Sequence, residues 1–261
     1  MITPALNPIL ASGALQFAFE KATTEGKITI SALLILSLFS WTIIITKFRQ
    51  LLIARQATKK FFAAYNSTRD PLDIQRKKEE FDGAPAYQLY VRGADELAYQ
   101  LEKNPVTVKG ERRISTASFE AVKVALEEAA GAEAMGLEKG MIVLSTAVAG
   151  GPFIGLLGTV WGVMSTFAGI AESKAATLTA MAPGVAAALV ATVTGLLVAI
   201  PAMFAYNFMV TTIRAITQEL DGYATRYATQ IVHSYVDNRD LEDKIAMALT
   251  RSEMGENTPA I

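Results

Sequence analysis

Hydroxyl groups set among glycines in apolar runs are the residues of this sequence best suited to chemistry. Thr159 follows Gly155 and Gly158 in "GLLGTVWGVMSTF", and Thr192 lies in the second apolar stretch "ALVATVTG". In a low-dielectric channel a hydroxyl can replace part of the water around an ion. The same hydroxyl can instead bond a carbonyl in the preceding turn of its own helix. From the residues alone, an ion-pathway role and a local helix-bonding role both stay open for Thr159 and Thr192.

Small residues recur around these threonines at helical spacing. The two stripes comprise Gly151, Gly155, Gly158, Gly162 and Gly169 in the first stretch, and Gly184, Ala188, Thr192, Gly195, Ala199 and Ala202 in the second. A glycine inside a helix costs ~1 kcal/mol relative to alanine, so its repeated use needs a reason. In lipid, small residues permit close backbone approach and tight contact between helices. We therefore predict that Gly155, Gly158, Gly162 and Gly195 pack these helices against each other or against copies of themselves.

Residue types argue against catalytic chemistry. The chain has no cysteine and one histidine, His233, so thiolate metal sites and an HExxH site are excluded. No G-x-x-x-x-G-K-[ST] loop is present to hold a nucleotide. His233 is predicted to be an ordinary histidine of a helix surface, with a proton-responsive role as the alternative. Glu127 and Glu128 are predicted to lie on a solvated helix face. We expect no enzyme, no cofactor and no metal site.

Three runs without any Asp, Glu, Lys, Arg or His predict an integral membrane protein. They cover 28–46, 141–171 and 175–213, in a chain that is 51% hydrophobic and only 19% charged. Each run reaches the roughly 20 residues that a helix needs to cross a bilayer. Pro183 is expected to begin the third crossing, because proline is comfortable at the first position of a helix. The fold class is therefore predicted to be all-α, with three transmembrane helices extended into long cytoplasmic helices.

The charges beside the first run predict the orientation. The residues that follow it carry five cations and no acid, namely Lys47, Arg49, Arg55, Lys59 and Lys60. Because cytoplasmic flanks are enriched in Lys and Arg, we place the N-terminus in the periplasm and the C-terminus in the cytoplasm. The net charge of −1 gives no indication of a nucleic-acid partner.

The resulting organisation has seven segments. They are a periplasmic or interfacial segment at 1–27, transmembrane helix 1 at 28–46, a cytoplasmic helical region at 47–140, transmembrane helix 2 at 141–171, a periplasmic turn at 172–182, transmembrane helix 3 at 183–210, and a cytoplasmic helical tail at 211–261. The first helix is expected to continue past the membrane, and 112–140 are expected to be helical. In the tail, apolar residues at steps of three and four predict one buried face: Ile213, Ile216, Leu220, Tyr223 and Tyr227. That face needs a partner, either from this chain or from a neighbouring subunit.

The segments "LEKGMIVLSTAVAGGPFIGLLGTVWGVMSTFAGIA" and "MAPGVAAALVATVTGLLVAIPAMFAYN" resemble the paired signature of the TolQ/ExbB/MotA proton-channel family. The likeness is closest to the three-transmembrane TolQ/ExbB branch, and it covers 137–210 strongly. It implies a homopentamer in the bacterial inner membrane that encloses two copies of an ExbD/TolR-like single-pass protein. It also implies that ion flow drives transport or other work at the outer membrane, through a TonB/TolA-like periplasm-spanning protein. Membrane lipid is a further expected partner.

The resemblance assigns Thr159 and Thr192 to the family's pore-facing threonines, but the sequence departs from the family at one position. TolQ and ExbB sequences usually carry a glutamate where this chain has Ala187, in "GVAAAL". Proton relays in membranes normally use acidic or histidine side chains, and none of the three crossings contains one. Either a partner helix brings an aspartate, or the chain conducts no protons. The predicted function is an ion-channel or motor subunit driven by protons or sodium, with a non-conducting membrane scaffold as the alternative. Thr194 adds a hydroxyl that could ligate a cation, although bonding to its own helix is favoured.

Overall fold

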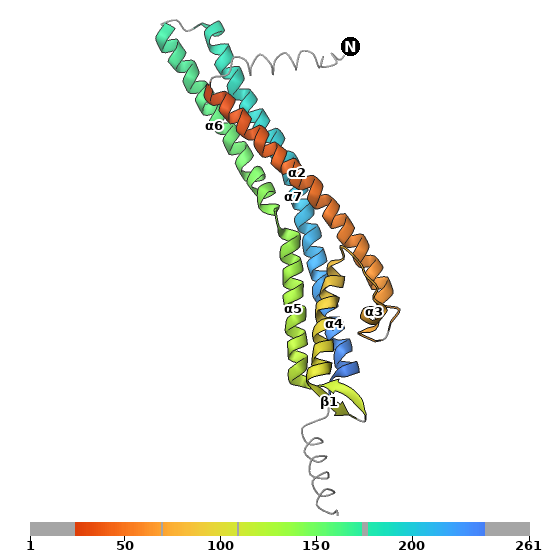
Figure 1. Ribbon diagram of the computed structural model, residues 1–261. Coiled ribbons are helices and arrows are strands. Elements are labelled where there is room, and N and C mark those ends of the chain that lie inside the picture. Colours follow the sequence, from red (N-terminus) through yellow and green to blue (C-terminus); the bar gives the residue numbers. More distant parts are fainter. Residues whose placement is uncertain (1–23, 69, 109, 174–176, 238–261) are drawn as a thin grey trace, which may run out of the picture. The chain divides into compact units, whose positions relative to one another are not determined.

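A computed structural model describes residues 24–68, 70–108, 110–173 and 177–237 (Figure 1). Long helices dominate the described residues. The elements are α2 (Thr24–Tyr65), α3 (Asp73–Lys77), α4 (Pro85–Lys103), β1 (Pro105–Val108), β2 (Glu111–Ile114), α5 (Thr116–Glu138), α6 (Met141–Ser173) and α7 (Leu178–Tyr235). Among these, α2, α6 and α7 are long and apolar enough to cross a membrane. The prediction of a helical membrane protein with three candidate crossings is therefore confirmed.

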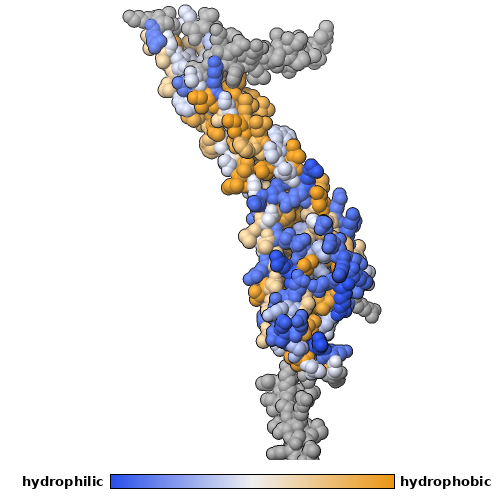
Figure 2. Space-filling model, viewed as in Figure 1, coloured by the Kyte–Doolittle hydropathy of each residue, from blue (hydrophilic) through white to orange (hydrophobic). Residues whose placement is uncertain are grey.

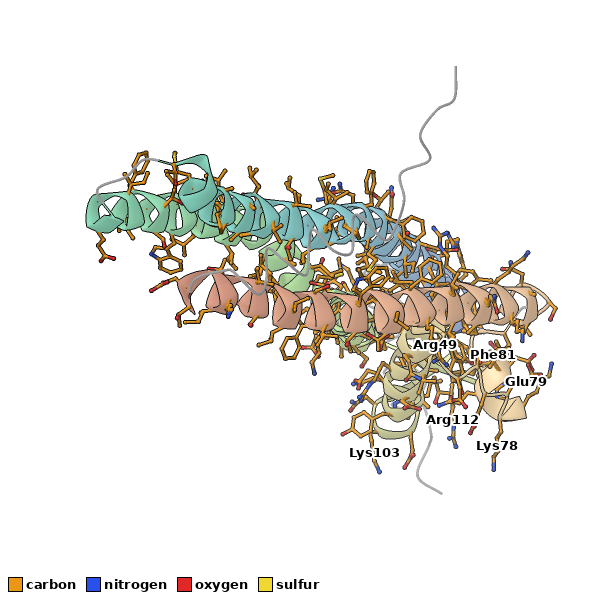
Figure 3. The ribbon with its side chains drawn as sticks, turned by 90° about the horizontal axis from the view of Figure 1, so that it is seen from above. Arg49, Lys78, Glu79, Phe81, Lys103 and Arg112 are labelled. Carbon is orange, nitrogen blue, oxygen red and sulfur yellow. The ribbon has the colours of Figure 1, made fainter. Side chains whose placement is uncertain are left out.

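The described residues divide into two units. Unit 1 holds 24–52 and 137–214, which include the three charge-free runs, and unit 2 holds 53–136 and 215–237. Many large hydrophobic side chains of α2, α6 and α7 are exposed on unit 1, and hydrophobic residues predominate on the face seen in Figure 2. A helix face that stays apolar and unburied is typical of contact with lipid. Unit 2 instead presents charged side chains such as Lys78, Lys103 and Arg112, which point away from its helices (Figure 3).

The start of the third long helix differs from the one expected. The first helix continues to Tyr65, as predicted, but α7 begins at Leu178 rather than at Pro183. The prediction that Pro183 opens the helix is wrong, and residues 178–182 of the expected turn are helical. A proline this close to a helix start removes only one backbone hydrogen bond, which membrane helices tolerate. Residues 174–176 of the same turn lie outside the described residues, as do 1–23 and 238–261.

A short β-hairpin in unit 2 replaces part of the helix expected at 112–140. Strands β1 and β2 pair antiparallel, with Val108 opposite Glu111, and Gly110 at the turn has φ +84°. The helical prediction is therefore wrong for residues 112–115, and also for the turn at 139–140. Helix α5 starts later because the Ser115 hydroxyl accepts a hydrogen bond from the Ser118 amide at 3.1 Å, which caps its first turn.

The apolar face predicted in the tail is buried within the chain. Ile213 is buried in unit 1, and Ile216, Leu220, Tyr223 and Tyr227 are buried in unit 2. The Tyr223 ring packs edge-on against Phe61, with ring centroids 5.5 Å apart. Helix α2 therefore supplies part of the partner surface that this face requires. His233, in the last turn of α7, is exposed, as are Glu127 and Glu128 on α5, so all three follow the surface placement expected for them.

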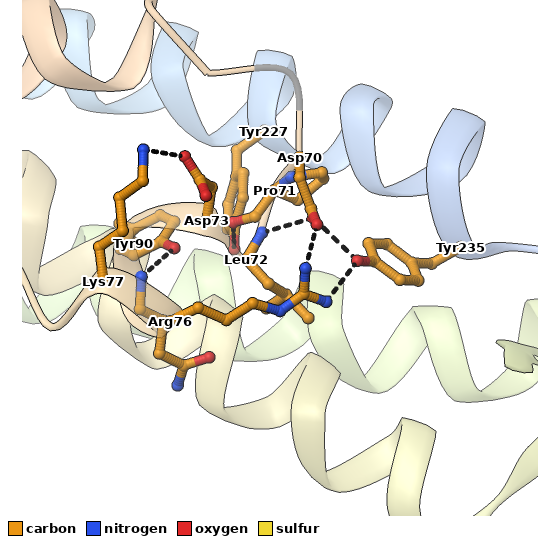
Figure 4. A network of polar contacts seen from close by, with 10 residues as sticks. Asp70, Pro71, Leu72, Asp73, Arg76, Lys77, Tyr90, Tyr227 and Tyr235 are labelled. Atoms are coloured by element: carbon orange, nitrogen blue, oxygen red, sulfur yellow. Dashed lines mark hydrogen bonds and ion pairs between the residues drawn. The ribbon is translucent and has the colours of Figure 1, made fainter.

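A polar network holds the segment after α2 to the end of α7 in unit 2 (Figure 4). The Asp70 carboxylate accepts hydrogen bonds from the Leu72 amide at 3.0 Å and the Tyr235 hydroxyl at 2.8 Å, and it pairs with Arg76. Burial acts to raise the pKa of Asp70. These hydrogen bonds and the Arg76 charge outweigh burial and hold that pKa below its usual value. The network therefore stabilises the ionised form of Asp70.

Candidate functional site

The candidate site is the seam where α6 and α7 lie antiparallel in unit 1, with glycines on both sides. A Cβ added at Gly155 would lie 3.0 Å from the Ala191 carbonyl oxygen and 3.1 Å from the Thr192 Cα. A Cβ at Gly151 would lie 3.0 Å from the Gly195 carbonyl oxygen. These neighbours are backbone atoms, which cannot turn aside as a side chain can. The two helices therefore approach each other at the distance that only glycine permits at these positions.

Helix α2 reaches the same seam through a residue that the sequence did not single out. A Cβ at Gly158 would lie 2.5 Å from the Ala191 Cβ and 3.1 Å from the Thr29 Cγ2. Thr29 is only 3% exposed, and its hydroxyl donates to the Glu25 carbonyl at 2.8 Å. At the far end of the seam, a Cβ at Gly162 would lie 3.0 Å from the Gly184 carbonyl oxygen. The position of Thr29, a polar residue within the first apolar run, was the feature of the sequence that could have indicated this contact.

The three threonine hydroxyls of interest on α6 and α7 have different partners, and only that of Thr192 bonds across the seam. Thr159 donates to the Leu156 carbonyl of its own helix at 2.6 Å. Thr192 donates across the seam to the Gly155 carbonyl of α6 at 3.3 Å. Thr194 donates to the Val190 carbonyl at 2.8 Å, so the backbone bond favoured for it is confirmed. One hydroxyl–carbonyl hydrogen bond, from Thr192 to Gly155, therefore links α7 to α6.

The described part of the three crossings adds no titrating group to these dipoles. Residues 28–46, 141–171 and 177–213 contain no Asp, Glu, Lys, Arg or His. Among the described residues, no group of three or more His, Cys, Asp or Glu side chains could hold a metal ion. Ala187, at the position where a glutamate was expected from the resemblance, is only 7% exposed. Among the described residues of the crossings, the polar groups are therefore hydroxyl and backbone dipoles, without a side-chain acid that could carry a proton.

A buried cation, Lys47, contacts the end of α5, just before α6 begins. The Lys47 ammonium donates to the Leu137 carbonyl at 2.9 Å and to the Gln50 side chain at 2.8 Å. Leu137 is in the last turn of α5, where carbonyl groups lack helical partners and attract positive charge. Gly140, with φ +87°, then separates this end from α6. Sequence analysis used Lys47 only for orientation and missed its contact with α5, because the two residues are far apart in the chain.

Comparison with known proteins identifies the family of this helical arrangement. Residues 97–222 match the MotA/TolQ/ExbB proton channel family. The chain is also 32% identical over 219 residues to the Tol-Pal system protein TolQ of Haemophilus influenzae, an alignment that covers 82% of this chain and 92% of that protein. The chain belongs to the MotA/TolQ/ExbB proton channel family. The family resemblance of the paired apolar segments is thus confirmed.

Two further relatives carry the name biopolymer transport protein ExbB. The protein of Pseudomonas putida is 32% identical over 198 residues, which cover 75% of this chain and 56% of that protein. The protein of Xanthomonas campestris pv. campestris (strain B100) is 30% identical over 221 residues, covering 80% of this chain and 86% of that protein. These relatives are named for transport and for the Tol-Pal system rather than for enzymes. The match to the MotA/TolQ/ExbB family spans α6 and most of α7, and therefore includes the glycine seam.

Proposed function

We propose that this chain is the ion-channel or motor subunit of an inner-membrane energy-transducing complex. It would use the proton or sodium motive force, together with an ExbD/TolR-like partner, to drive transport or envelope work at the outer membrane. The observation that supports this most directly is that the match to a proton channel family spans α6 and most of α7, the helices that carry Thr159 and Thr192. The names of two relatives, a Tol-Pal system protein and a biopolymer transport protein, support transport or envelope work as the process that the complex drives.

In this proposal Thr159 and Thr192 offer their hydroxyl oxygens to a passing ion, or to the waters that carry a proton. Each hydroxyl donates its hydrogen to a carbonyl, which leaves oxygen lone pairs free to accept or to ligate. Because the described crossings hold no acidic side chain, proton conduction would need a titrating group from the partner's membrane helix. The chain then supplies dipoles and shape, and the partner supplies the proton carrier.

The assembly we propose is a homopentamer around two partner helices, with a TonB/TolA-like protein transmitting the work. The closest contacts of Gly155, Gly158, Gly162 and Gly195 are made inside one chain. Contacts between copies would therefore use other faces, on which α2, α6 and α7 expose many large apolar side chains. The N-terminus is proposed to be periplasmic and the C-terminus cytoplasmic, on the basis of the cations after the first crossing.

A non-conducting scaffold is the second candidate, and one observation favours it. Both candidate hydroxyls already have carbonyl partners, and Ala187 supplies no carboxylate. Under this alternative the threonines contribute only helix bonding and the seam contributes only packing. The two candidates differ in what happens when the hydroxyl oxygens alone are removed.

The deciding experiment measures ion flux through the chain and its ExbD/TolR-like partner in vesicles that contain a pH- or sodium-sensitive dye. The double variant Thr159→Val/Thr192→Val keeps the volume and branching of both side chains. It should still assemble, because hydrogen bonds between membrane helices average only ~0.6 kcal/mol. We expect flux to fall about tenfold or more, the factor for losing roughly one net hydrogen bond to the ion or its water.

Thr194→Val is the matched control, because it removes a hydroxyl of the same helix that bonds its own backbone. It should leave flux within about twofold of the unmodified complex, less than one net hydrogen bond would change it. Undiminished flux in the assembled double variant would remove Thr159 and Thr192 from the pathway. A complex with intact threonines that conducts no ion would support the scaffold.

A further inference from the structure

A groove in unit 1 lies where the apolar parts of α6 and α7 meet their first charged neighbours. It has a volume of about 350 Å³. Its lining includes Glu138, Met141 and Ile142 on one side, and Val210, Ile213 and Arg214 on the other. Met141 and Ile213 are buried and form apolar floor, whereas Ile142 is 72% exposed. The groove therefore has an apolar part, with Ile142 open to the surroundings, and a charged end.

The charged end carries one cation and one anion from different helices. Glu138 and Arg214 are both exposed, and neither forms an ion pair or a side-chain hydrogen bond with another residue in the described ranges. Tyr206 also lines the groove, and its phenol has no hydrogen-bond partner among the side chains and backbone groups described. Tyrosine favours the level where a bilayer meets water, since it joins an apolar ring to a polar tip. The groove thus offers a positive, a negative and a neutral polar group at the membrane boundary.

We infer that this groove binds one zwitterionic phospholipid with a primary amine, phosphatidylethanolamine. Arg214 and Tyr206 would donate to the lipid phosphate, and Glu138 would accept from the ammonium group. The first acyl carbons would lie over Ile142 and Val210. Charge complementarity selects this occupant: an anionic lipid without an amine leaves the Glu138 carboxylate facing a phosphate. The volume lies at the lower end of the ~300–1,000 Å³ typical of small-molecule sites, and it suits a headgroup rather than a whole lipid.

This inference depends on the chain crossing a bilayer and not on ion conduction, so the two proposals can fail separately. Basic pockets between membrane helices bind lipid headgroups in other proteins. This groove differs from a purely basic pocket because the Glu138 carboxylate lines it together with Arg214. The quantity to measure is therefore the preference for phosphatidylethanolamine over phosphatidylglycerol.

The first experiment identifies the occupant directly. The photoreactive residue p-benzoyl-phenylalanine replaces Ile142 in the full chain, which is reconstituted in vesicles of equal phosphatidylethanolamine and phosphatidylglycerol. After irradiation, the intact mass should increase by that of phosphatidylethanolamine. A crosslink to a second copy of the chain, an adduct mainly of phosphatidylglycerol, or no lipid adduct would each overturn the inference.

The second experiment tests the two charges by native mass spectrometry of lipids retained by the complex. Arg214→Gln should lower retention of both lipids about fivefold, the factor for one basic side chain near a lipid surface. Glu138→Gln should lower the ratio of phosphatidylethanolamine to phosphatidylglycerol by a similar factor. Lys139→Gln is the control, because Lys139 adjoins Glu138 but does not line the groove. An equal lipid ratio in the Glu138→Gln and Lys139→Gln variants would refute the site.

Discussion

Replacing Gly155 by alanine tests the close approach of α6 and α7 with the smallest possible change. The new Cβ would lie 3.0 Å from the Ala191 carbonyl oxygen and 3.1 Å from the Thr192 Cα. Ordinary contacts of a Cβ atom begin at about 3.4 Å, so the helices must separate locally by a few tenths of an ångström. That separation also lengthens the hydrogen bond from Thr192 to the Gly155 carbonyl, which is already 3.3 Å long.

The magnitude follows from a comparison with Gly150→Ala in the same helix. A Cβ at Gly150 meets nothing within 4 Å, so this variant changes helix propensity but adds no close contact. Both substitutions gain the same ~1 kcal/mol of propensity, and that gain cancels in the difference. Overpacking a close contact costs ~1–3 kcal/mol. Gly155→Ala should therefore be about 1–3 kcal/mol less stable than Gly150→Ala.

The assay is reversible unfolding of the purified chain in mixed micelles, with helicity followed by circular dichroism as the denaturing detergent increases. Unfolding midpoints and slopes give the free energy of unfolding for each variant. Equal stability of the two alanine variants, or greater stability of Gly155→Ala, would refute the argument that the two backbones are in contact at the seam.

Three further predictions address assembly, orientation and pH. Gly158→Leu should disrupt the packing of α6 against α7 within each chain, and thereby prevent pentamer formation, because its Cβ alone would lie 2.5 Å from the Ala191 Cβ. Native mass spectrometry should show mainly pentamer before the change, and a normal pentamer after it would contradict the packing account. Thr177 and Gln56 are both exposed, and the chain has no other cysteine to label. Thr177→Cys should therefore react with an impermeant thiol reagent from the periplasmic side, and Gln56→Cys only after the membrane is opened. Equal labelling of both from outside would contradict the proposed orientation. The lowered pKa of Asp70 contributes stability that is present above its ordinary value of 3.8 and is lost as the pH falls through the lower folded value. The protection of residues 70–77 against hydrogen exchange, taken relative to the intrinsic rate at each pH, should therefore fall below about pH 4 in the unmodified chain. Asp70→Asn should lower this protection already at neutral pH and remove its acid dependence, whereas an unchanged profile would show that the network does not stabilise this segment.

Some features of this protein depend on local pattern and are determined by the sequence. The three charge-free runs require helices, because a backbone in lipid must satisfy its own hydrogen bonds. The first helix continues to Tyr65 because the apolar and charged residues that follow the first run include no proline or glycine to end it. The buried tail face from Ile216 to Tyr227 follows from helical periodicity, which specifies the side to be covered but not the covering residues. Family membership was likewise predictable, since it rests on long contiguous segments.

Other features depend on residues that are distant in the chain, and only the tertiary structure decided them. The hairpin of β1 and β2 has four-residue strands whose stability comes from pairing, so their local sequence gave no strong signal. The spacing of the glycines indicates which face of each helix carries small residues. The carbonyl group that each glycine approaches depends instead on the register between α6 and α7. The same register gives Thr192 a partner on α6 while Thr159 bonds its own helix, although both threonines have similar sequence surroundings. Likewise, Lys47 meets the end of α5 only because folding brings together residues 90 positions apart.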